Sequence, residues 1–373
     1  MKIQRLGQVA ALALVGSIAL AGCGSDNNTA GSSSSSSATG SAASAGCFEG
    51  TLNAEGSSAQ KNAFEEAAAS FLEKCPGGTV NYNPTGSGAG IKQFIAGQVD
   101  FAGSDSALKT VEKDGVIETD AAAKTCGSPA WNIPMVTGPI AIAYNVAGVD
   151  KLILTPAVAA DIFNGKITTW NDPAIAAINP GATLPSTAIK VFFRSDESGT
   201  TENFTKYLNA AAPDKWAAEP AKVWSGKGEG KEKSAGVAEG VKSTDGGITY
   251  VEWSYAKDND LSIAQVDNGG GATELTAQSV GKAVEAAKAD GEGNDLRLKL
   301  DYTTKEAGAY PILLVTYEIV CSKNSDATKA ANIKAFLKHF SSVDVQKSLE
   351  EIGYAPLPTS VQTQVAAAVD ALS

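Results

Sequence analysis

Residues 191–204, VFFRSDESGTTENF, change from the pattern of a strand to that of a helix within one polar turn. The first three residues are apolar and indicate a strand, and Phe204, Tyr207 and Leu208 recur at helical spacing after the turn. The Ser-Gly-Thr between the two segments would leave unpaired N–H groups at the start of the helix, where anions are attracted. Arg194 adds a fork of donors that suits a tetrahedral oxyanion. The alternative is an ordinary strand-to-helix turn with a surface ion pair.

The same unit of strand, polar turn and helix is repeated earlier in the chain. The corresponding turns are Glu55–Ala59, Thr85–Gly90 and Val99–Asp105. Such repetition predicts parallel α/β sheets, in which ligands bind beyond the carboxyl ends of the strands. We therefore expect Ser58, Ser87 and Asp105 to lie near the turn described above if the sheets face each other.

The first 22 residues have the features of an export signal. Two basic residues precede the apolar run 9–21, and the segment ends in Leu-Ala-Gly before Cys23. This ending resembles the bacterial lipobox, in which the cysteine is acylated and becomes the first mature residue. The alternative is a short membrane anchor that is not cleaved. Residues 23–46 are rich in Ser and Gly and predict a flexible tether that spans about 25 Å, so the chain is expected at the extracytoplasmic face of the cell membrane.

Composition limits the classes of function that remain. Cleavage before Cys23 leaves 351 of the 373 residues, which is typical of two domains. Loss of Lys2 and Arg5 takes the formal net charge from −11 to −13, and no basic run is present, so we expect no nucleic-acid partner. In so acidic a chain, an anion site has to be built from local donors.

The cysteines of the mature domain predict disulfide bonds. They are Cys47, Cys75, Cys126 and Cys321. None forms a C-x-x-C pair, and His339 is the only histidine, so we expect no metal and no cofactor. An even number in an exported chain favours two disulfides. Three connectivities are possible, of which we prefer Cys47–Cys75, flanking one predicted helix, with Cys126–Cys321.

Two long apolar runs, 138–146 and 310–320, are interpreted as crossings between two lobes. Lobe 1 would then comprise residues 47–138 and 310–373, and lobe 2 residues 139–309. Residues 222–242, rich in Lys, Glu and Gly, are expected to form a solvated loop or the rim of a helix.

Together these turns resemble the phosphate-binding protein of the bacterial high-affinity phosphate ABC transporter. The segments that carry the resemblance are Glu55–Ser58, Gly86–Gly90, Val99–Asp105, Ile162–Pro173, Arg194–Thr201 and Gly246–Trp253. The resemblance covers nearly all of residues 51–358. It implies an α/β fold, the two-lobed periplasmic-binding-protein type II clamshell, with mixed sheets flanked by helices and two crossing strands.

The same resemblance implies a set of phosphate contacts and a set of partners. The contacts would be Ser58, Ala59, Ser87, Gly88, Asp105, Arg194, Ser198, Gly199 and Thr200. Asp196 would orient Arg194. Many members have an aromatic residue or Leu where this chain has Ala59, so the backbone donor is retained but the pocket wall is smaller. The implied partners are inorganic phosphate and the permease subunits with their cytoplasmic ATPase, and the lipid on Cys23 would contact the membrane.

Asp105 is the residue that would distinguish phosphate from sulfate. Phosphate at neutral pH still carries a proton, whereas sulfate does not, and an ionised carboxylate can only accept. A site built to use a ligand hydroxyl rejects analogues without it by about 10⁴ or more. The alternative role of Asp105 is that of a helix N-cap.

Three other functions remain open at this point. A receptor for another tetrahedral oxyanion is the nearest alternative. A phosphate-ester hydrolase is less well supported, because no G-x-S-x-G turn or metal-ligand cluster is present and His339 falls in a predicted surface helix. A surface adhesin would use the five tryptophans and nine tyrosines as a binding face.

Overall fold

The computed structural model describes residues 46–113 and 115–373. Cys23 and most of the predicted tether lie outside these residues. The strands are β1 (Gly50–Gly56), β2 (Gly78–Asn83), β3 (Phe101–Ser104), β4 (Ala130–Asn145), β5 (Ile153–Leu154), β6 (Lys190–Arg194), β7 (Glu229–Lys231), β8 (Gly247–Glu252), β9 (Ser262–Ile263), β10 (Gln265–Asp267), β11 (Ala272–Thr273), β12 (Lys288–Ala289), β13 (Leu298–Lys299) and β14 (Leu313–Cys321). The helices are α1 (Lys61–Lys74), α2 (Ser87–Ile95), α3 (Glu118–Cys126), α4 (Pro156–Phe163), α5 (Pro173–Ile178), α6 (Gly199–Ala211), α7 (Lys233–Lys242), α8 (Trp253–Asp258), α9 (Ala277–Glu285), α10 (Ala327–Phe340), α11 (Val343–Glu351) and α12 (Thr359–Asp370). Among these helices none has the length and apolarity needed to span a bilayer.

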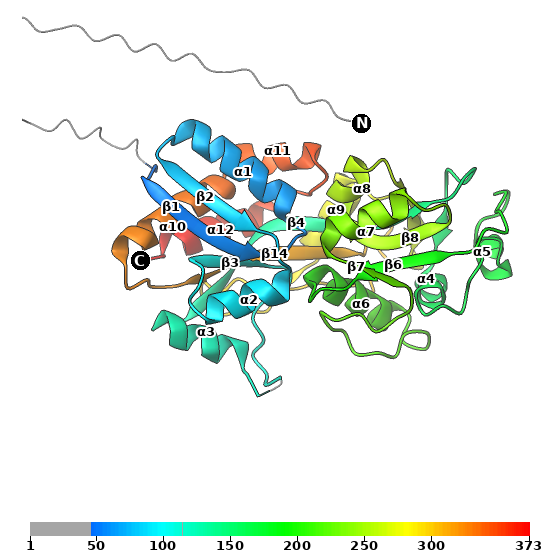
Figure 1. The fold of residues 1–373 in the computed structure, drawn as a ribbon, viewed down its shortest axis with the longest axis horizontal. Coiled ribbons are helices and arrows are strands. Elements are labelled where there is room, and N and C mark those ends of the chain that lie inside the picture. The colour runs from blue at the N-terminus through cyan, green and yellow to red at the C-terminus, as the bar shows by residue number, and fades with distance from the viewer. Residues whose placement is uncertain (1–45, 114) are drawn as a thin grey trace, which may run out of the picture. The chain divides into compact units, whose positions relative to one another are not determined.

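One sheet runs through the whole described domain in the order β2-β1-β3-β14-β4-β8-β6-β7 (Figure 1). The outer strands are parallel on both sides: β1 pairs with β2 and β3, and β6 pairs with β7 and β8. The two central strands, β14 and β4, run antiparallel to each other and to their neighbours. β4 and β14 are almost fully buried, as expected for apolar strands that are covered on both faces.

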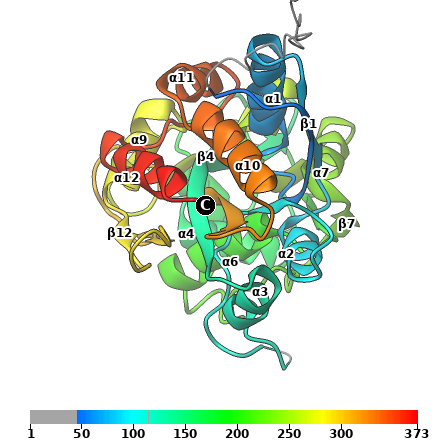
Figure 2. The same ribbon diagram turned by 90° about the vertical axis from the view of Figure 1, so that its left-hand side faces the viewer.

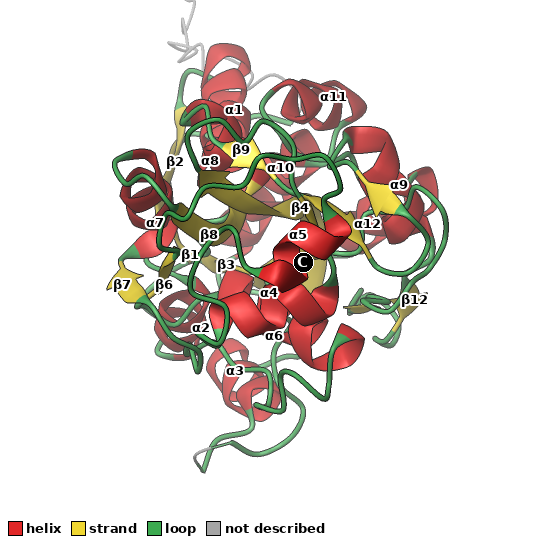
Figure 3. Ribbon diagram, turned by 90° about the vertical axis from the view of Figure 1, so that its right-hand side faces the viewer, coloured by secondary structure: helices red, strands yellow, loops and turns green. Residues whose placement is uncertain are grey.

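Two large hydrophobic clusters divide the domain around these central strands. We call lobe 1 the part that packs around Phe64, Phe101 and Phe336, and lobe 2 the part that packs around Phe163 and Trp170. In lobe 1, α1 lies beside α10 (Figure 2). Aromatic rings of the two helices are in contact. In lobe 2, α4 to α8 surround the β6 to β8 side of the sheet (Figure 3). The lobe boundaries at 138/139 and 309/310 stay a prediction.

One disulfide of the described domain packs on the lobe 1 cluster, and the other packs on a smaller cluster formed by α2, α3 and β14. Cys47 is joined to Cys75 at the end of α1, and Cys126 at the end of α3 is joined to Cys321 at the end of β14. These pairs are the connectivity preferred from the sequence, and the second closes a separation of 195 residues.

The segment 222–242 differs from the solvated loop or rim expected for it. Its second half forms α7, which buries Ser234, Val237, Ala238 and Val241 against the sheet. The many Lys and Glu residues indicated exposure, but they occupy the outer face of the helix, while the small and apolar residues between them face inward.

Candidate functional site

Polar side chains follow the carboxyl ends of the parallel strands in both lobes. In lobe 1, Ser58 follows β1, Ser87 begins the helix after β2, and Asp105 follows β3. In lobe 2, Arg194 is the last residue of β6 and Glu252 the last residue of β8. All five side chains are buried, with at most 3% of any residue exposed. The strand ends therefore bring donors and acceptors from both lobes into one buried region.

Asp105 accepts hydrogen bonds from three hydroxyl groups. Ser57 and Thr316 donate to Oδ1 at 2.6 and 2.7 Å, and Ser87 donates to Oδ2 at 3.1 Å. Thr316 lies where the register between β14 and β4 shifts, and such bulges commonly re-aim a side chain. Because each of these neighbours acts as a donor, Asp105 is arranged as an acceptor, and its free capacity lies mainly on Oδ2.

Burial is the main influence on the charge of Asp105. It raises the pKa of this carboxyl to about 6, with the Ser57 hydroxyl opposing the rise and the negative charge of Glu252 adding to it. The group is therefore ionised at neutral pH and becomes protonated in mildly acidic solution.

Arg194 is held in place by Asp196. Its Nε and Nη2 atoms donate to the two carboxylate oxygens of Asp196 at 2.7 and 2.5 Å, a bidentate pair. Burial alone would lower the pKa of Arg194 and raise that of Asp196, but their mutual hydrogen bonds and charges reverse both shifts. The remaining nitrogen, Nη1, donates to Ser234 Oγ at 3.1 Å and Thr200 Oγ1 at 3.4 Å. Asp196 thus pairs with Arg194, and its role in orienting the arginine toward a ligand stays a prediction.

The first turn of lobe 1 meets lobe 2 through hydroxyl groups. Ser58 Oγ lies 2.9 Å from Ser234 Oγ and accepts from the N–H of Ser234 at 3.3 Å. The N–H of Ala59, predicted to contact the ligand, donates here to Ser57 Oγ at 3.0 Å. Ser58 is therefore two hydrogen bonds from Arg194, with Ser234 between them.

The N-termini of α2 and α6 face each other across the lobes. Gly88 N–H donates to the backbone oxygen of Glu197 at 3.0 Å, and Ser198 caps α6 by accepting from Thr201 N–H. A Cβ atom added at Gly199 would lie 2.5 Å from Ser87 Oγ and 2.6 Å from Asp105 Cβ. Gly199 is thus in direct contact with the Asp105 group, and only glycine fits at this position.

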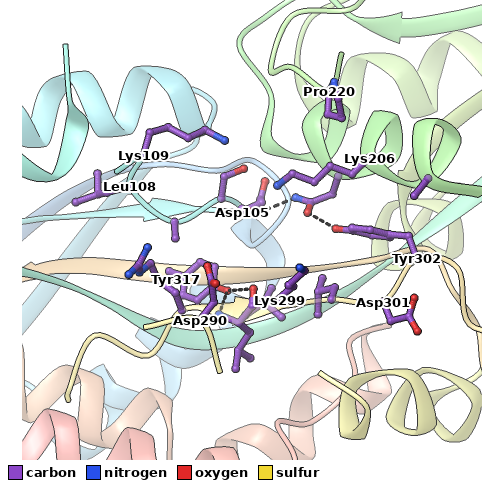
Figure 4. Close-up of a pocket in the computed structure, with 18 of the residues that line it drawn as sticks. Asp105, Leu108, Lys109, Lys206, Pro220, Asp290, Lys299, Asp301, Tyr302 and Tyr317 are labelled. Atoms are coloured by element: carbon purple, nitrogen blue, oxygen red, sulfur yellow. Dashed lines mark hydrogen bonds between the residues drawn. The ribbon is translucent and has the colours of Figure 1, made fainter. Parts of the chain in front are cut away.

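A cavity of about 640 Å³ lies beside Asp105, between α6, β13 and β14 (Figure 4). Its lining includes the cationic residues Lys109, Lys206, Arg297 and Lys299. Lys109 and Lys206 both pair with the buried carboxylate of Glu202, which also accepts from Ser106 Oγ at 2.8 Å. Asp105, Asp290 and Asp301 line the same cavity, and Arg297 pairs with Asp295, so the positive charges there are largely balanced.

Four polar residues of this region were not among the predicted site residues. They are Ser57, Ser234, Glu252 and Thr316. The Ser57 hydroxyl donates to Asp105 and does not cap α1, which begins after Gln60. Thr316 and Glu252 could have been found from the sequence, because each is a polar residue within an apolar strand. Buried polar groups need hydrogen-bond partners, so such residues indicate a polar site nearby.

His339 lies away from these strand ends. It belongs to α10, where Nε2 is 2.8 Å from Ser70 Oγ and the ring packs on Phe71. Among the described residues no cluster of His, Cys, Asp and Glu has the arrangement of a metal site.

Comparisons with known proteins match both the fold and the sequence. The family model described as a PBP superfamily domain matches residues 30–343. A high-affinity periplasmic phosphate-binding protein, solved with phosphate bound, superposes with a TM-score of 0.69 over 85% of this chain and 93% of that chain, at 22% identity. A phosphate-binding protein from Stenotrophomonas maltophilia gives 0.67 over 86% and 94%, also at 22% identity. The chain therefore belongs to the PBP superfamily, and the fold class expected from the sequence is confirmed.

The sequence relatives define the family more narrowly. The phosphate-binding protein PstS2 of Mycobacterium bovis BCG is 44% identical over the full length of both chains, and PstS3 of the same organism is 43% identical over the full length of both. The phosphate-binding protein PstS of Xylella fastidiosa is 34% identical over 78% of this chain and 77% of its own. Within the superfamily, the chain belongs to the family of phosphate-binding proteins.

Proposed function

We propose that this protein captures inorganic phosphate outside the cytoplasmic membrane and delivers it to the permease of a phosphate ABC transporter. The proposal rests on two groups that lie in one buried region built from both lobes. Arg194 is held by Asp196 in a bidentate pair, and Asp105 accepts hydrogen bonds from all of its hydroxyl neighbours. The arginine and the helix N-termini supply donors for an oxyanion, and Asp105 supplies an acceptor for its acidic proton. The protein acts as a receptor and not as an enzyme.

The proposed ligand contacts are those expected from the sequence. The N–H groups of Ala59 and Gly88 and the hydroxyl of Ser198 have partners within the protein here and would have to exchange them on binding. Two further contacts are refined as follows. The hydroxyl of Thr200 donates to Glu252 Oε1. We therefore expect the turn before α6 to contact the ligand through the N–H groups of Gly199 and Thr200. Ser58 would exchange its contact with Ser234 for one with phosphate, since Ser234 also accepts from Arg194 Nη1 and so links Ser58 to the arginine.

We also propose that the protein is attached to the membrane through a lipid on Cys23. The support is the Leu-Ala-Gly-Cys sequence at the end of a basic and then apolar leader. The disulfides fit an oxidising, extracytoplasmic location. ABC permease subunits with a cytoplasmic ATPase would be the docking partners of the closed receptor.

Calorimetric titration of the mature domain with phosphate tests the proposal directly. We expect saturable binding of one phosphate per chain, and little displacement by a large excess of sulfate. Failure to bind phosphate under any condition, in a sample whose folding is verified by circular dichroism, would exclude the proposed function. Tighter binding of sulfate would instead assign the receptor to another oxyanion.

Replacing Gly199 with alanine should weaken phosphate binding by about 10- to 100-fold. The added Cβ would overlap Ser87 and Asp105, and overpacking of this kind costs about 1–3 kcal/mol. Titration calorimetry measures the loss. Gly281→Ala is the matched control, because no atom lies within 4 Å of a Cβ at that position in α9. Equal affinities of the Gly199→Ala variant and the wild type would show that this contact is not made in the bound state.

A further inference from the structure

A buried carboxylate joins the two lobes beside the strand ends. Glu202 lies in the first turn of α6, in lobe 2, and only 2% of its side chain is exposed. The carboxylate accepts from Lys109 Nζ and, at 2.8 Å, from Ser106 Oγ. Both of these residues come shortly after Asp105 on the lobe 1 side. The contact therefore joins the loop that carries Asp105 to the helix that begins at Gly199.

A second pair of charges crosses between the lobes next to the first. Lys222 Nζ lies 3.8 Å from Glu118 Oε1 and 3.8 Å from Glu202 Oε2. Glu118, the first residue of α3, also accepts from the N–H of Lys109 at 2.8 Å. Lys222 belongs to lobe 2, where its backbone oxygen accepts from the N–H of Ser198. We call Lys109, Glu118, Lys222 and Glu202 the charge ring; each lobe contributes one cation and one anion to it.

Glu202 is ionised in this arrangement. Burial alone would raise its pKa, but the charges of Lys206, Lys222 and Lys109 hold the pKa well below its ordinary value. Lys206 is one turn further along α6, with Nζ 3.1 Å from the carboxylate. If the lobes move apart, Glu202 loses Lys109 but keeps the two lysines of its own lobe. No buried charge is then left without a partner, so the contact between the lobes can break and form again at moderate cost.

The charge ring lies next to the site but outside the proposed ligand contacts. All four of its residues line a cavity of about 300 Å³ at the boundary between the lobes. Lys109 also lines the larger cavity beside Asp105 (Figure 4). A contact that is made only when the lobes are together stabilises the closed form over the open one, whichever anion is bound. Its effect is expected on release of the ligand, because a bound anion leaves only after the lobes separate.

Resting on the proposed function, we propose that the charge ring is a latch that holds the two lobes closed around phosphate. Lys109 and Glu202 are positioning residues in this role, because they hold the lobes together without contacting the ligand. The latch slows the dissociation of phosphate and leaves the choice between phosphate and sulfate unchanged. The side chain of Lys109 is 34% exposed, so dissolved salt screens its charge and weakens the latch.

Lys109→Ala should release phosphate about tenfold faster than the wild type, because loss of one partner of a buried charge pair acts mainly on the dissociation rate. Lys206→Ala is the matched control. Lys206 pairs with the same carboxylate and its side chain is equally exposed, at 35%, but it lies on the same helix as Glu202 and joins no lobes. Its dissociation rate should stay close to that of the wild type. Radiolabelled phosphate, chased with an excess of unlabelled phosphate, gives the three rates.

Two further measurements separate a latch from a merely structural role. Small-angle X-ray scattering in the absence of ligand follows the opening of the lobes, and the radius of gyration should be larger for Lys109→Ala than for the wild type or Lys206→Ala. Added potassium chloride should speed up dissociation from the wild type more than from Lys109→Ala. The ratio of phosphate affinity to sulfate affinity should be the same in all three proteins.

Each outcome decides one part of the proposal. A wild-type dissociation rate in Lys109→Ala overturns the latch and leaves the proposed function standing. Equal acceleration in Lys109→Ala and Lys206→Ala assigns the effect to positive charge near the site, and a changed ratio of phosphate to sulfate affinity makes Lys109 a ligand contact; both overturn the latch. Absence of phosphate binding by the folded wild type overturns the proposed function, and the scattering comparison then still tests whether the charge ring holds the lobes together.

Discussion

Arg194→Ala should bind phosphate at least about a hundredfold more weakly than the wild type, and every other oxyanion should be weakened in the same way. Loss of two charge-assisted hydrogen bonds at about 1.5 kcal/mol or more each accounts for this minimum. The Asp196 carboxylate, which is 16% exposed, would also lose its bidentate partner and present its charge to the ligand. Titration calorimetry with phosphate and with sulfate measures both losses.

Arg297→Ala is the matched control for this experiment. Arg297 also pairs with an aspartate two residues away, Asp295, but it lines the cavity beside the site and not the strand ends. It should bind phosphate within a few-fold of the wild type. Arg194→Lys retains the charge without the planar fork, and an intermediate loss is expected. Normal phosphate affinity in Arg194→Ala, with the fold intact, would contradict the proposed site.

Asp105→Asn should reduce the preference for phosphate over sulfate by at least about a hundredfold. The Ser57 and Thr316 hydroxyls both donate to Oδ1, so the amide oxygen takes that position and the amide nitrogen takes the place of Oδ2. The amide N–H group then replaces the acceptor Oδ2, which is the oxygen that has room for a ligand hydrogen bond. Sulfate no longer meets a negative charge at this position. Competition titrations of phosphate against sulfate give the ratio of the two affinities, which can reach about 10⁴ for a site of this type.

The preference of the wild type for phosphate over sulfate should depend on pH through the charge of Asp105. Because the pKa of Asp105 is raised to about 6, the carboxyl is ionised at pH 8 and largely protonated at pH 5. Sulfate should therefore compete better as the pH falls through about 6, and Asp105→Asn should not show this step. In contrast, Asp196→Asn should weaken phosphate and sulfate alike. A sulfate preference that does not change in Asp105→Asn would remove Asp105 from the selective contact.

Local patterns were sufficient for the elements that surround the site. Residues 191–204 predicted a strand, a turn and a helix, and the structure has β6 up to Arg194 and α6 from Gly199. The buried face of α6 contains Phe204, Tyr207 and Leu208, as their spacing indicated. The order β3-β14-β4-β8 could not be derived in this way, because it depends on pairing between strands far apart in the chain.

The site itself was only partly predictable. A polar residue after a parallel strand is visible in the sequence, and this pattern identified Ser58, Ser87 and Asp105. The partners of Asp105 were not visible, because the hydroxyl of Thr316 lies in an apolar strand whose register with β4 shifts beside it. Ser234 was missed because its helix follows a segment whose charged residues suggested exposure.

The two disulfides have a consequence for how this chain matures after export. Both lie on the side of the sheet that is built from segments at the two ends of the domain, whereas no disulfide joins the described residues of lobe 2. Cys126 and Cys321 can be joined only after the whole of lobe 2 has emerged between them. A cell that lacks thiol-oxidising capacity outside its membrane should therefore produce a receptor in which lobe 1 is vulnerable to proteolysis, while lobe 2 retains its packing.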